Sequence, residues 1–199
     1  FTMTTEEKIF NAARIVFQKK GFTGARMQEI ADEAGINKAM LHYCFKNKEL
    51  LFQAVFMNAF GQLAPQINEI FNSNETVFEK IKKFTDSYIS FVIQNPHLPA
   101  FIIQEMNNNQ QFVMSFLNNE NKPNPSQFVL QIEKEIQDVI IININPKQLL
   151  LDIFSMTAFP FVAQTLVKGI LQISDSEFNL MMEERKTTIA NQIINTIKR

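Results

Sequence analysis

The chain has 199 residues, of which 46% are hydrophobic, and its net charge is −1 with an isoelectric point near 6.2. That composition fits a globular protein of one or two domains, and no uninterrupted apolar run reaches the roughly 20 residues that span a bilayer. Residues 1–50 carry a charge of +2 and the remainder −3, which argues against indiscriminate binding to polyanions but allows a localised contact with phosphates.

Several other classes of protein are also excluded. The single cysteine, Cys44, rules out an intramolecular disulfide and is typical of a reducing compartment. The start of the chain lacks a signal-peptide pattern, because residues 4–8 are polar and Arg14 interrupts the apolar stretch that follows. No nucleophile elbow, phosphate-binding glycine loop or metal-ligand spacing is present. We therefore expect a cytoplasmic protein that is not an enzyme, holds no cofactor or metal and does not enter the membrane.

Apolar residues recur at intervals of three and four along nearly the whole chain, which predicts an all-α protein. The first helix is expected to begin at Thr4, since Glu7 three residues later completes a capping box, and to end before Gly21. A second helix is expected from near Arg26 and a third from near Asn37.

Residues 27–46 have the spacing of a helix-turn-helix. Ala31 is small where two helices must approach closely, and Gly35 can adopt the left-handed conformation that ends the first of them. Asn37 can cap the second helix, on which Leu41 and Phe45 face the core. The outer side of that helix then fits the DNA major groove. The predicted DNA contacts on this helix and its flanks are Thr23, Arg26, Gln28, Asn37, Lys38, Met40, His42, Tyr43 and Lys48.

Beyond this motif, Asn47 is expected to cap a helix that starts at Lys48, and Pro65 is expected to kink or break it. The stretch 118–125, with two prolines and four asparagines, is expected to be an exposed loop. The later helices are predicted at about 75–94, 100–107, 110–117, 126–143, 146–173 and 176–198.

A set of residues in the first quarter of the chain resembles the amino-terminal domain of TetR-type (tetracycline-repressor-like) regulators. These residues are Ile9, Ala12, Ala13, Phe17, Gly21, Phe22, Ile30, Ala31, Ala34, Gly35, Leu41, Phe45, Lys48, Glu49 and Leu51. The resemblance implies an all-α fold with an amino-terminal three-helix DNA-binding domain over 3–48 and a larger helical ligand-binding and dimerisation domain over 49–199. It also implies a homodimer that binds an operator and releases it when a small ligand binds.

The larger part of the chain is rich in Phe and Met, side chains that can line an irregular pocket for an apolar ligand, although such residues also form ordinary cores. The candidate ligand contacts are Phe84, Tyr88, Phe91, Phe101, Met106, Phe112, Met114, Phe116, Phe128, Phe154 and Met156.

The last two predicted helices carry apolar residues on more than one face, which favours contact with both the core of the chain and a second subunit. The resemblance implies a four-helix bundle made of these helices from two subunits. The candidate interface residues are Phe159, Val162, Leu166, Ile170, Met181, Ile189, Ile193 and Ile197.

Together these features predict a transcriptional regulator, a repressor released from a palindromic double-stranded operator by a small apolar or amphipathic effector. The alternative is a dimeric helical carrier of an apolar ligand that does not read DNA sequence. Its support is the overall negative charge and three residues, Ala39, His42 and Cys44, that depart from the family pattern. A sequence-independent architectural DNA binder is a third possibility, and the weak basic excess of residues 1–50 speaks against it.

Overall fold

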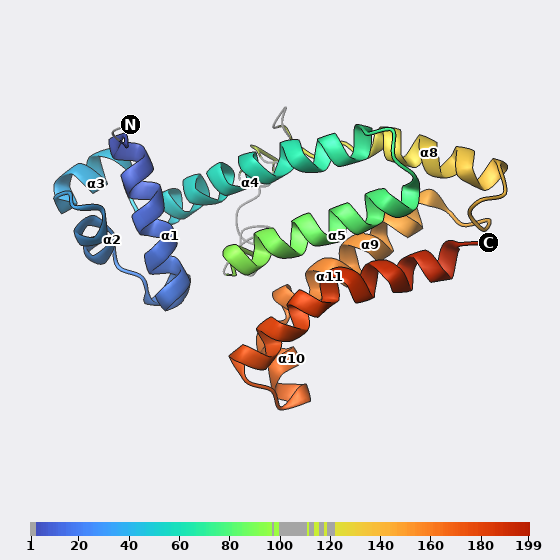
Figure 1. The fold of residues 1–199 in the computed structure, drawn as a ribbon. Coiled ribbons are helices and arrows are strands. Elements are labelled where there is room, and N and C mark those ends of the chain that lie inside the picture. Colours follow the sequence, from blue (N-terminus) through green and yellow to red (C-terminus); the bar gives the residue numbers. More distant parts are fainter. Residues whose placement is uncertain (1–2, 97, 100–110, 112–113, 116–117, 119–121) are drawn as a thin grey trace. The chain divides into compact units, whose positions relative to one another are not determined.

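The computed structural model describes residues 3–96, 98–99, 111, 114–115, 118 and 122–199 (Figure 1). The chain divides into two compact units, an amino-terminal unit of residues 1–61 and 95–118 and a carboxy-terminal unit of residues 62–94 and 119–199. The regular elements in the described part of the chain are all helices, and its only extended pairing is an isolated bridge between Ile141 and Lys198. The predicted all-α fold is confirmed.

Helix α1 (Thr5–Gly24) begins as predicted, with the Thr4 hydroxyl accepting from the Glu7 amide and the Glu7 carboxylate accepting from the Thr4 amide. Its regular geometry is interrupted at Gly21, which has a φ of 67°, so the predicted end before Gly21 corresponds to a kink followed by a short last turn. Positive φ is unfavourable for residues with a Cβ, so glycine is the residue this kink requires.

Three phenylalanine rings hold α1 against the start of α4 (Lys48–Asn72). The ring centroids of Phe17 and Phe52 lie 4.5 Å apart, and those of Phe22 and Phe52 lie 5.3 Å apart in an edge-to-face arrangement. Ile9 and Ala13 of α1 are fully buried beside them. This aromatic core fixes the helix behind which α2 and α3 pack.

Helix α4 starts as predicted, because the Asn47 side chain accepts from the Leu50 amide at 2.8 Å. It continues through Pro65 as one element, so the break expected there is absent, at the cost of the hydrogen bond that a proline nitrogen cannot donate. The division between the two units falls within this helix, after Gly61.

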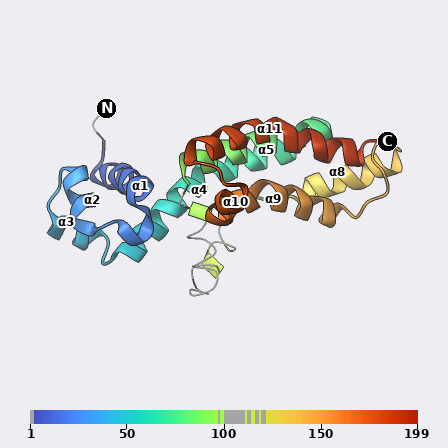
Figure 2. The ribbon, with the colours of Figure 1, turned by 90° about the horizontal axis from the view of Figure 1, so that it is seen from below.

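The carboxy-terminal unit consists of the end of α4, α5 (Val77–Gln94), α8 (Ser126–Gln137), α9 (Pro146–Val162), α10 (Gln164–Leu171) and α11 (Asp175–Ile197). Helices α5 and α11 pack along one another, as both views show (Figures 1 and 2). The Phe71 ring stacks on Phe128 at 5.1 Å and on Phe84 at 5.7 Å between centroids. These stacked rings form the centre of a continuous apolar core.

A buried polar network closes two helix ends in this unit. The Lys80 ammonium donates to the Phe71 carbonyl at 2.8 Å, near the end of α4, and to the Gln131 side chain. The Glu135 carboxylate accepts from the Val77 amide at 3.2 Å, at the start of α5, and from Gln131 at 2.8 Å. Burial lowers the pKa of Lys80, and the nearby Glu135 carboxylate opposes that shift.

The predicted helix over 126–143 is wrong in its last third, because α8 ends at Gln137. Val139 has a φ of 64°, which a helix does not tolerate, and the chain then turns to run beside the end of α11. There the Ile142 amide donates to the Ile197 carbonyl at 2.9 Å. The β-branched run after Val139 favours this extended pairing over helix.

The single helix predicted over 146–173 is two helices, α9 and α10, that meet at Ala163 with a bend of 76°. Pro160 has no N–H to donate to the Met156 carbonyl four residues earlier. The Arg185 guanidinium of α11 donates to that carbonyl instead, from Nε at 3.2 Å and from Nη2 at 2.9 Å. The helix therefore ends soon after its proline, and a distant side chain satisfies the acceptor that the proline leaves.

The final predicted helix over 176–198 is observed as α11, which starts one residue earlier because Ser174 and Glu177 form a capping box. The helices predicted over 100–107 and 110–117 lie wholly or largely outside the described residues. In the part of the chain that the structure describes, a membrane-crossing length of apolar helix is reached only by α9 and α10 taken together across their bend, and by no single helix.

Candidate nucleic-acid interface

The turn between α2 (Met27–Ala34) and α3 (Lys38–Cys44) has the geometry that the sequence predicts. Gly35 adopts the left-handed conformation, with a φ of 66°, and the Ile36 amide donates back to the Ala31 carbonyl at 3.0 Å. Asn37 then caps α3, its side-chain oxygen accepting from the Met40 amide at 2.7 Å. The two helices are thus joined by three residues, with the backbone groups at the junction hydrogen-bonded.

The inner faces of the two helices are closely packed. Ile30, Ala31 and Leu41 have no exposed surface, and α2 contacts both α1 and α3. Phe45, which follows α3, is half-buried, and its ring lies 6.0 Å from that of Phe10. Leu41 is the buried residue of α3, so the packing of this side chain in the core sets the orientation of the helix, and the other residues of α3 are exposed.

The outer face of α3 is open to solvent and carries all four predicted contact residues of that helix. The Tyr43 side chain is 87% exposed, the highest value among the exposed large apolar and aromatic residues, and Met40 is 43% exposed. Lys38 and His42 are exposed beside them. A short helix with this combination of an ammonium, an imidazole, a phenol and a thioether can donate to, accept from and pack against base edges.

The hydrogen bond of His42 defines what its ring offers to DNA. Its Nδ1 atom lies 3.3 Å from the Lys46 carbonyl, and a carbonyl oxygen can only accept, so Nδ1 carries the proton in this contact. In the neutral ring with that tautomer, Nε2 is an acceptor. Such an atom can accept from the amino groups of adenine or cytosine.

The predicted contacts on the α2 side are also exposed, although some already have partners within the unit. Thr23 and Arg26 are at the surface next to the start of α2. The Gln28 amide nitrogen donates to the Asp32 carboxylate at 2.8 Å within α2. The Lys20 ammonium binds Glu29 at 2.8 Å, and this hydrogen bond lowers the pKa of the Glu29 carboxyl. Two carboxylates of α2, Glu29 and Asp32, are therefore bound by side chains of the same unit.

Lys48 has a structural role that the sequence did not indicate. Its ammonium donates to the carbonyl of Ala25 at 3.1 Å and to that of Thr23 at 3.5 Å, and lies 4.7 Å from the centre of the Phe22 ring. These contacts join the end of α1 to the start of α4 and use two of its three N–H groups. Its contact with a phosphate stays a prediction.

The candidate ligand residues are divided between the core and the surface. Phe84 and Phe128 are at most 2% exposed and covered by the stacked rings of the core, so they cannot reach a ligand unless that core opens. Tyr88 and Phe91 are half-buried, and Phe154, Met156 and Met114 are exposed. Burial raises the pKa of Tyr88 to about 12. Four candidates lie outside the described residues, namely Phe101, Met106, Phe112 and Phe116.

Three of the eight candidate interface residues are buried in the structure. Ile189, Ile193 and Ile197 are at most 3% exposed because α11 turns them into the core of its own unit, so they offer no surface to a second subunit. The remaining five are exposed, from 37% to 69%, and α10 has no buried residue at all. These five are Phe159, Val162, Leu166, Ile170 and Met181. Leu151, Leu171 and Leu180 are also exposed.

No group of three or more His, Cys, Asp or Glu side chains that could hold a metal ion occurs among the described residues, and Cys44 is exposed. The site that the described geometry favours is therefore the outer surface of the helix-turn-helix.

Comparison with known proteins identifies the same region. The model of the bacterial regulatory proteins of the tetR family matches residues 9–55. The chain is 20% identical to YttP of Bacillus subtilis (strain 168), named a probable HTH-type transcriptional regulator, over 94% of this chain and 93% of that protein. It is 41% identical to the HTH-type transcriptional repressor NicS of Pseudomonas putida over 57 residues, which are 29% of this chain and 27% of that protein.

A solved structure with the same fold covers nearly the whole chain. The TetR-family transcriptional regulator HI0893 from Haemophilus influenzae aligns with a TM-score of 0.57 and 15% identity, over 98% of this chain and 97% of that one. The matches are to transcription regulators and not to enzymes. The resemblance inferred from the first quarter of the sequence is confirmed.

Proposed function

We propose that this chain, a TetR-type transcription regulator, is a homodimeric repressor that binds a palindromic operator and releases it when a small effector binds. The observation that carries the proposal is the surface of α3, where Lys38, Met40, His42 and Tyr43 are exposed while Leu41 of the same helix is fully buried. An exposed, firmly held helix of this kind fits the major groove. Acting on DNA, the protein would work in the cytoplasm.

Two copies associate, in this proposal, through α9, α10 and α11. The exposed apolar residues of α10, Leu166 and Ile170, have no partner surface of their own because no residue of that helix is buried. Phe159 and Met181 extend the same kind of surface onto α9 and α11. A two-fold dimer would present two α3 helices to two half-sites, about one helical turn of DNA or somewhat more apart.

The effector is proposed to be apolar or amphipathic and to contact the accessible side of the aromatic cluster in the carboxy-terminal unit. The Phe84 ring lies 5.8 Å from Tyr88 and 5.2 Å from Phe154, and the latter two are less buried than Phe84. A ligand that binds one arrangement of this unit better than another would shift the population between DNA-binding and released states.

The test is a selection of bound duplexes from a randomised DNA library with purified protein at near-physiological salt. Enrichment of one palindrome is expected. On that sequence, Lys38→Ala and Tyr43→Ala should each weaken binding by about tenfold, the loss of one base contact. Lys147→Ala removes an equivalent charge from the start of α9 and should change affinity little.

Two results would contradict the proposal. A folded dimer that enriches no sequence would instead be a ligand carrier. Equal affinity for all duplexes, falling steeply with salt, would indicate an architectural DNA binder.

A further inference from the structure

An exposed stripe runs along one face of α9. Its members, Leu151, Ser155 and Phe159, follow one another at intervals of four residues, so they lie on the same side of the helix. Leu151 is 57% exposed and Phe159 is 58% exposed. Two large apolar side chains are therefore open to solvent on either side of a serine, whose small side chain lets a second helix approach closely.

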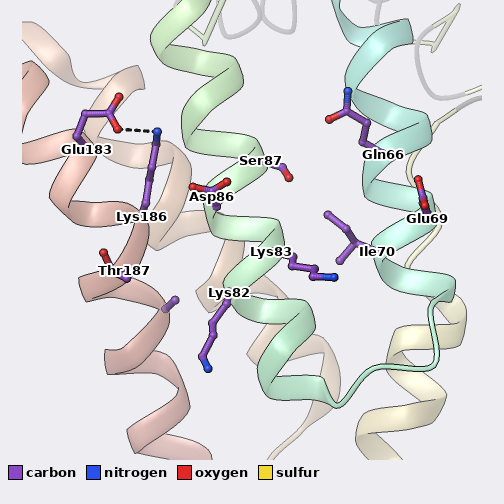
Figure 3. Close-up of a pocket in the computed structure, with 11 residues that line it drawn as sticks. Gln66, Glu69, Ile70, Lys82, Lys83, Asp86, Ser87, Glu183, Lys186 and Thr187 are labelled. Atoms are coloured by element: carbon purple, nitrogen blue, oxygen red, sulfur yellow. Dashed lines mark ion pairs between the residues drawn. The ribbon is translucent and has the colours of Figure 1, made fainter.

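A positive charge without a carboxylate partner lies beside this stripe. The half-buried Arg185 guanidinium of α11 donates to the Met156 carbonyl of α9, and it forms no salt bridge in the described part of the chain. Burial lowers the pKa of this guanidinium, and a carboxylate bound to it would oppose that shift. The neighbouring Lys186, by contrast, is paired with Glu183 at 2.6 Å, the contact marked in Figure 3.

An unpaired carboxylate lies next to the same stripe. Asp152 follows Leu151 directly, is exposed, and forms no salt bridge among the residues that the structure describes. It lies about one turn before Met156 on α9, where the Arg185 guanidinium is held, yet the two charges do not meet within one chain. A surface that covered the stripe would take both charges out of water, and each would then need an opposite charge.

A two-fold axis supplies both partners at once. If α9 packs antiparallel to its own copy with Ser155 on the axis, Leu151 lies opposite Phe159 of the partner subunit, because each is four residues from Ser155. Met156 lies one residue after Ser155 and Asp152 three residues before it. Asp152 of the partner subunit therefore falls about 3 Å along the helix from Met156, within reach of the guanidinium bound there.

We propose that two copies of this chain pack their α9 helices antiparallel about Ser155, with Arg185 of each copy bound to Asp152 of the partner subunit. The proposal rests on the homodimer proposed above and adds the register of its interface and the charge pair that fixes it. Under two-fold symmetry the pair occurs twice. Two charges placed in this way favour a second copy of the chain over another apolar partner.

The test is sedimentation equilibrium of the full chain without DNA. Asp152→Asn should raise the dissociation constant of the dimer about a hundredfold, because it removes two charge pairs at about tenfold each. Glu184→Gln removes the carboxylate adjacent to Arg185 on α11, and Glu133→Gln removes one from the exposed side of α8. Both should leave the dissociation constant unchanged.

A mixing experiment tests whether the pair joins two subunits. Asp152→Lys and Arg185→Glu, each alone, place like charges opposite one another and should be monomeric at micromolar concentration. An equimolar mixture of the two should dimerise, because both pairs of the mixed dimer then join opposite charges. Circular dichroism verifies that each variant is folded. Arg185→Glu also loses its hydrogen bonds to Met156, so Asp152→Asn, which keeps them, decides the matter if Arg185→Glu is unfolded.

Three results would overturn the proposal. They are a dimer of Asp152→Asn as tight as that of the unchanged chain, a mixture of folded variants that stays monomeric, and weaker association of Glu184→Gln with Asp152→Asn unaffected. A monomeric unchanged chain would contradict the proposed homodimer itself. A dimer that is insensitive to Asp152 would contradict only the register and the charge pair.

Discussion

The two units of this protein differ in where the side chains that bind their helix backbones come from in the sequence. In the amino-terminal unit the helix starts are capped locally, with Thr4, Asn37 and Asn47 each accepting from an amide three residues later, and Lys48 binds the carbonyls at the end of α1. In the carboxy-terminal unit α9 and α11 also start with local caps, at Asn145 and Ser174, but backbone groups of α5 and α9 are bound by side chains of other helices. Glu135 binds the Val77 amide, and Arg185 binds the Met156 carbonyl, from 58 and 29 residues away.

This difference matches the different roles expected of the two units. A recognition helix must present the same face each time it meets DNA, and local caps keep its geometry independent of the rest of the chain. Polar contacts between helices, such as those of Lys80 and Arg185, couple the position of one helix to that of another. A unit built in this way can change arrangement when a ligand alters one contact.

The largest expected effect tests the buried network of the carboxy-terminal unit. Glu135→Ala leaves the Val77 amide without its acceptor and removes the larger of the two carboxylate interactions, with Glu135 and Glu75, that compensate the buried Lys80 ammonium. We expect a loss of about 3 kcal/mol in the free energy of unfolding. Glu135→Gln keeps an acceptor and should lose less. The measurement is urea unfolding followed by circular dichroism.

Hydrogen exchange shows which of the two units loses stability in Glu135→Ala. Peptides from α5 and α8 should exchange faster in Glu135→Ala, whereas peptides from α2 and α3 should not change. Glu133→Ala, on the exposed side of the same helix, is the matched control. If the two alanine variants were equally stable, the network would not hold the unit together.

The second prediction concerns the bend between α9 and α10. Arg185→Ala removes two hydrogen bonds to the Met156 carbonyl and should cost about 2 kcal/mol. Pro160→Ala restores the amide that this carbonyl lacks. In that background Arg185→Ala should therefore cost clearly less, which a double-mutant cycle in urea measures. Additive losses would show that Arg185 does not compensate for the proline.

The features that could be predicted from the sequence lie mainly in the amino-terminal unit. The caps at Thr4, Asn37 and Asn47 and the left-handed Gly35 depend on neighbours within a few residues, so their pattern is visible in the chain. The match with TetR-type regulators also came from this region. These positions gave the fold of the helix-turn-helix and the exposed face of α3.

The predictions that were wrong concern helix ends and packing that depend on residues distant in the sequence. The end of α8 depends on pairing between Ile141 and Lys198, which no local pattern indicates. Pro160 indicates from the sequence alone that α9 ends nearby. How strongly it favours that end depends on Arg185, which supplies the donor that the proline lacks. The isoleucines of α11 could be assigned to the core or to an interface only once the position of α5 was known.

The groove between α4, α5 and α11 (Figure 3) could not be found from the sequence either. Its residues are ordinary charged helix positions, each of which is typical of a solvated surface. Only the packing of α4, α5 and α11 brings Glu69, Asp86 and Glu183 onto one concave surface.

The smallest effect makes the most direct comparison of the two units, because both have an asparagine cap. Asn37 accepts from the Met40 amide at the start of α3, and Asn145 accepts from the Lys147 amide at the start of α9. Replacing either by alanine should cost about 1 kcal/mol in the free energy of unfolding. Only Asn37→Ala should also weaken operator binding, measured by fluorescence anisotropy with the selected palindrome, because α3 has seven residues and its first turn depends on that cap.

Asn37→Ser, which keeps an acceptor, should recover most of both losses. If Asn145→Ala weakened operator binding as strongly, the geometry of α3 would depend on the carboxy-terminal unit and the independence of the recognition unit would be disproved.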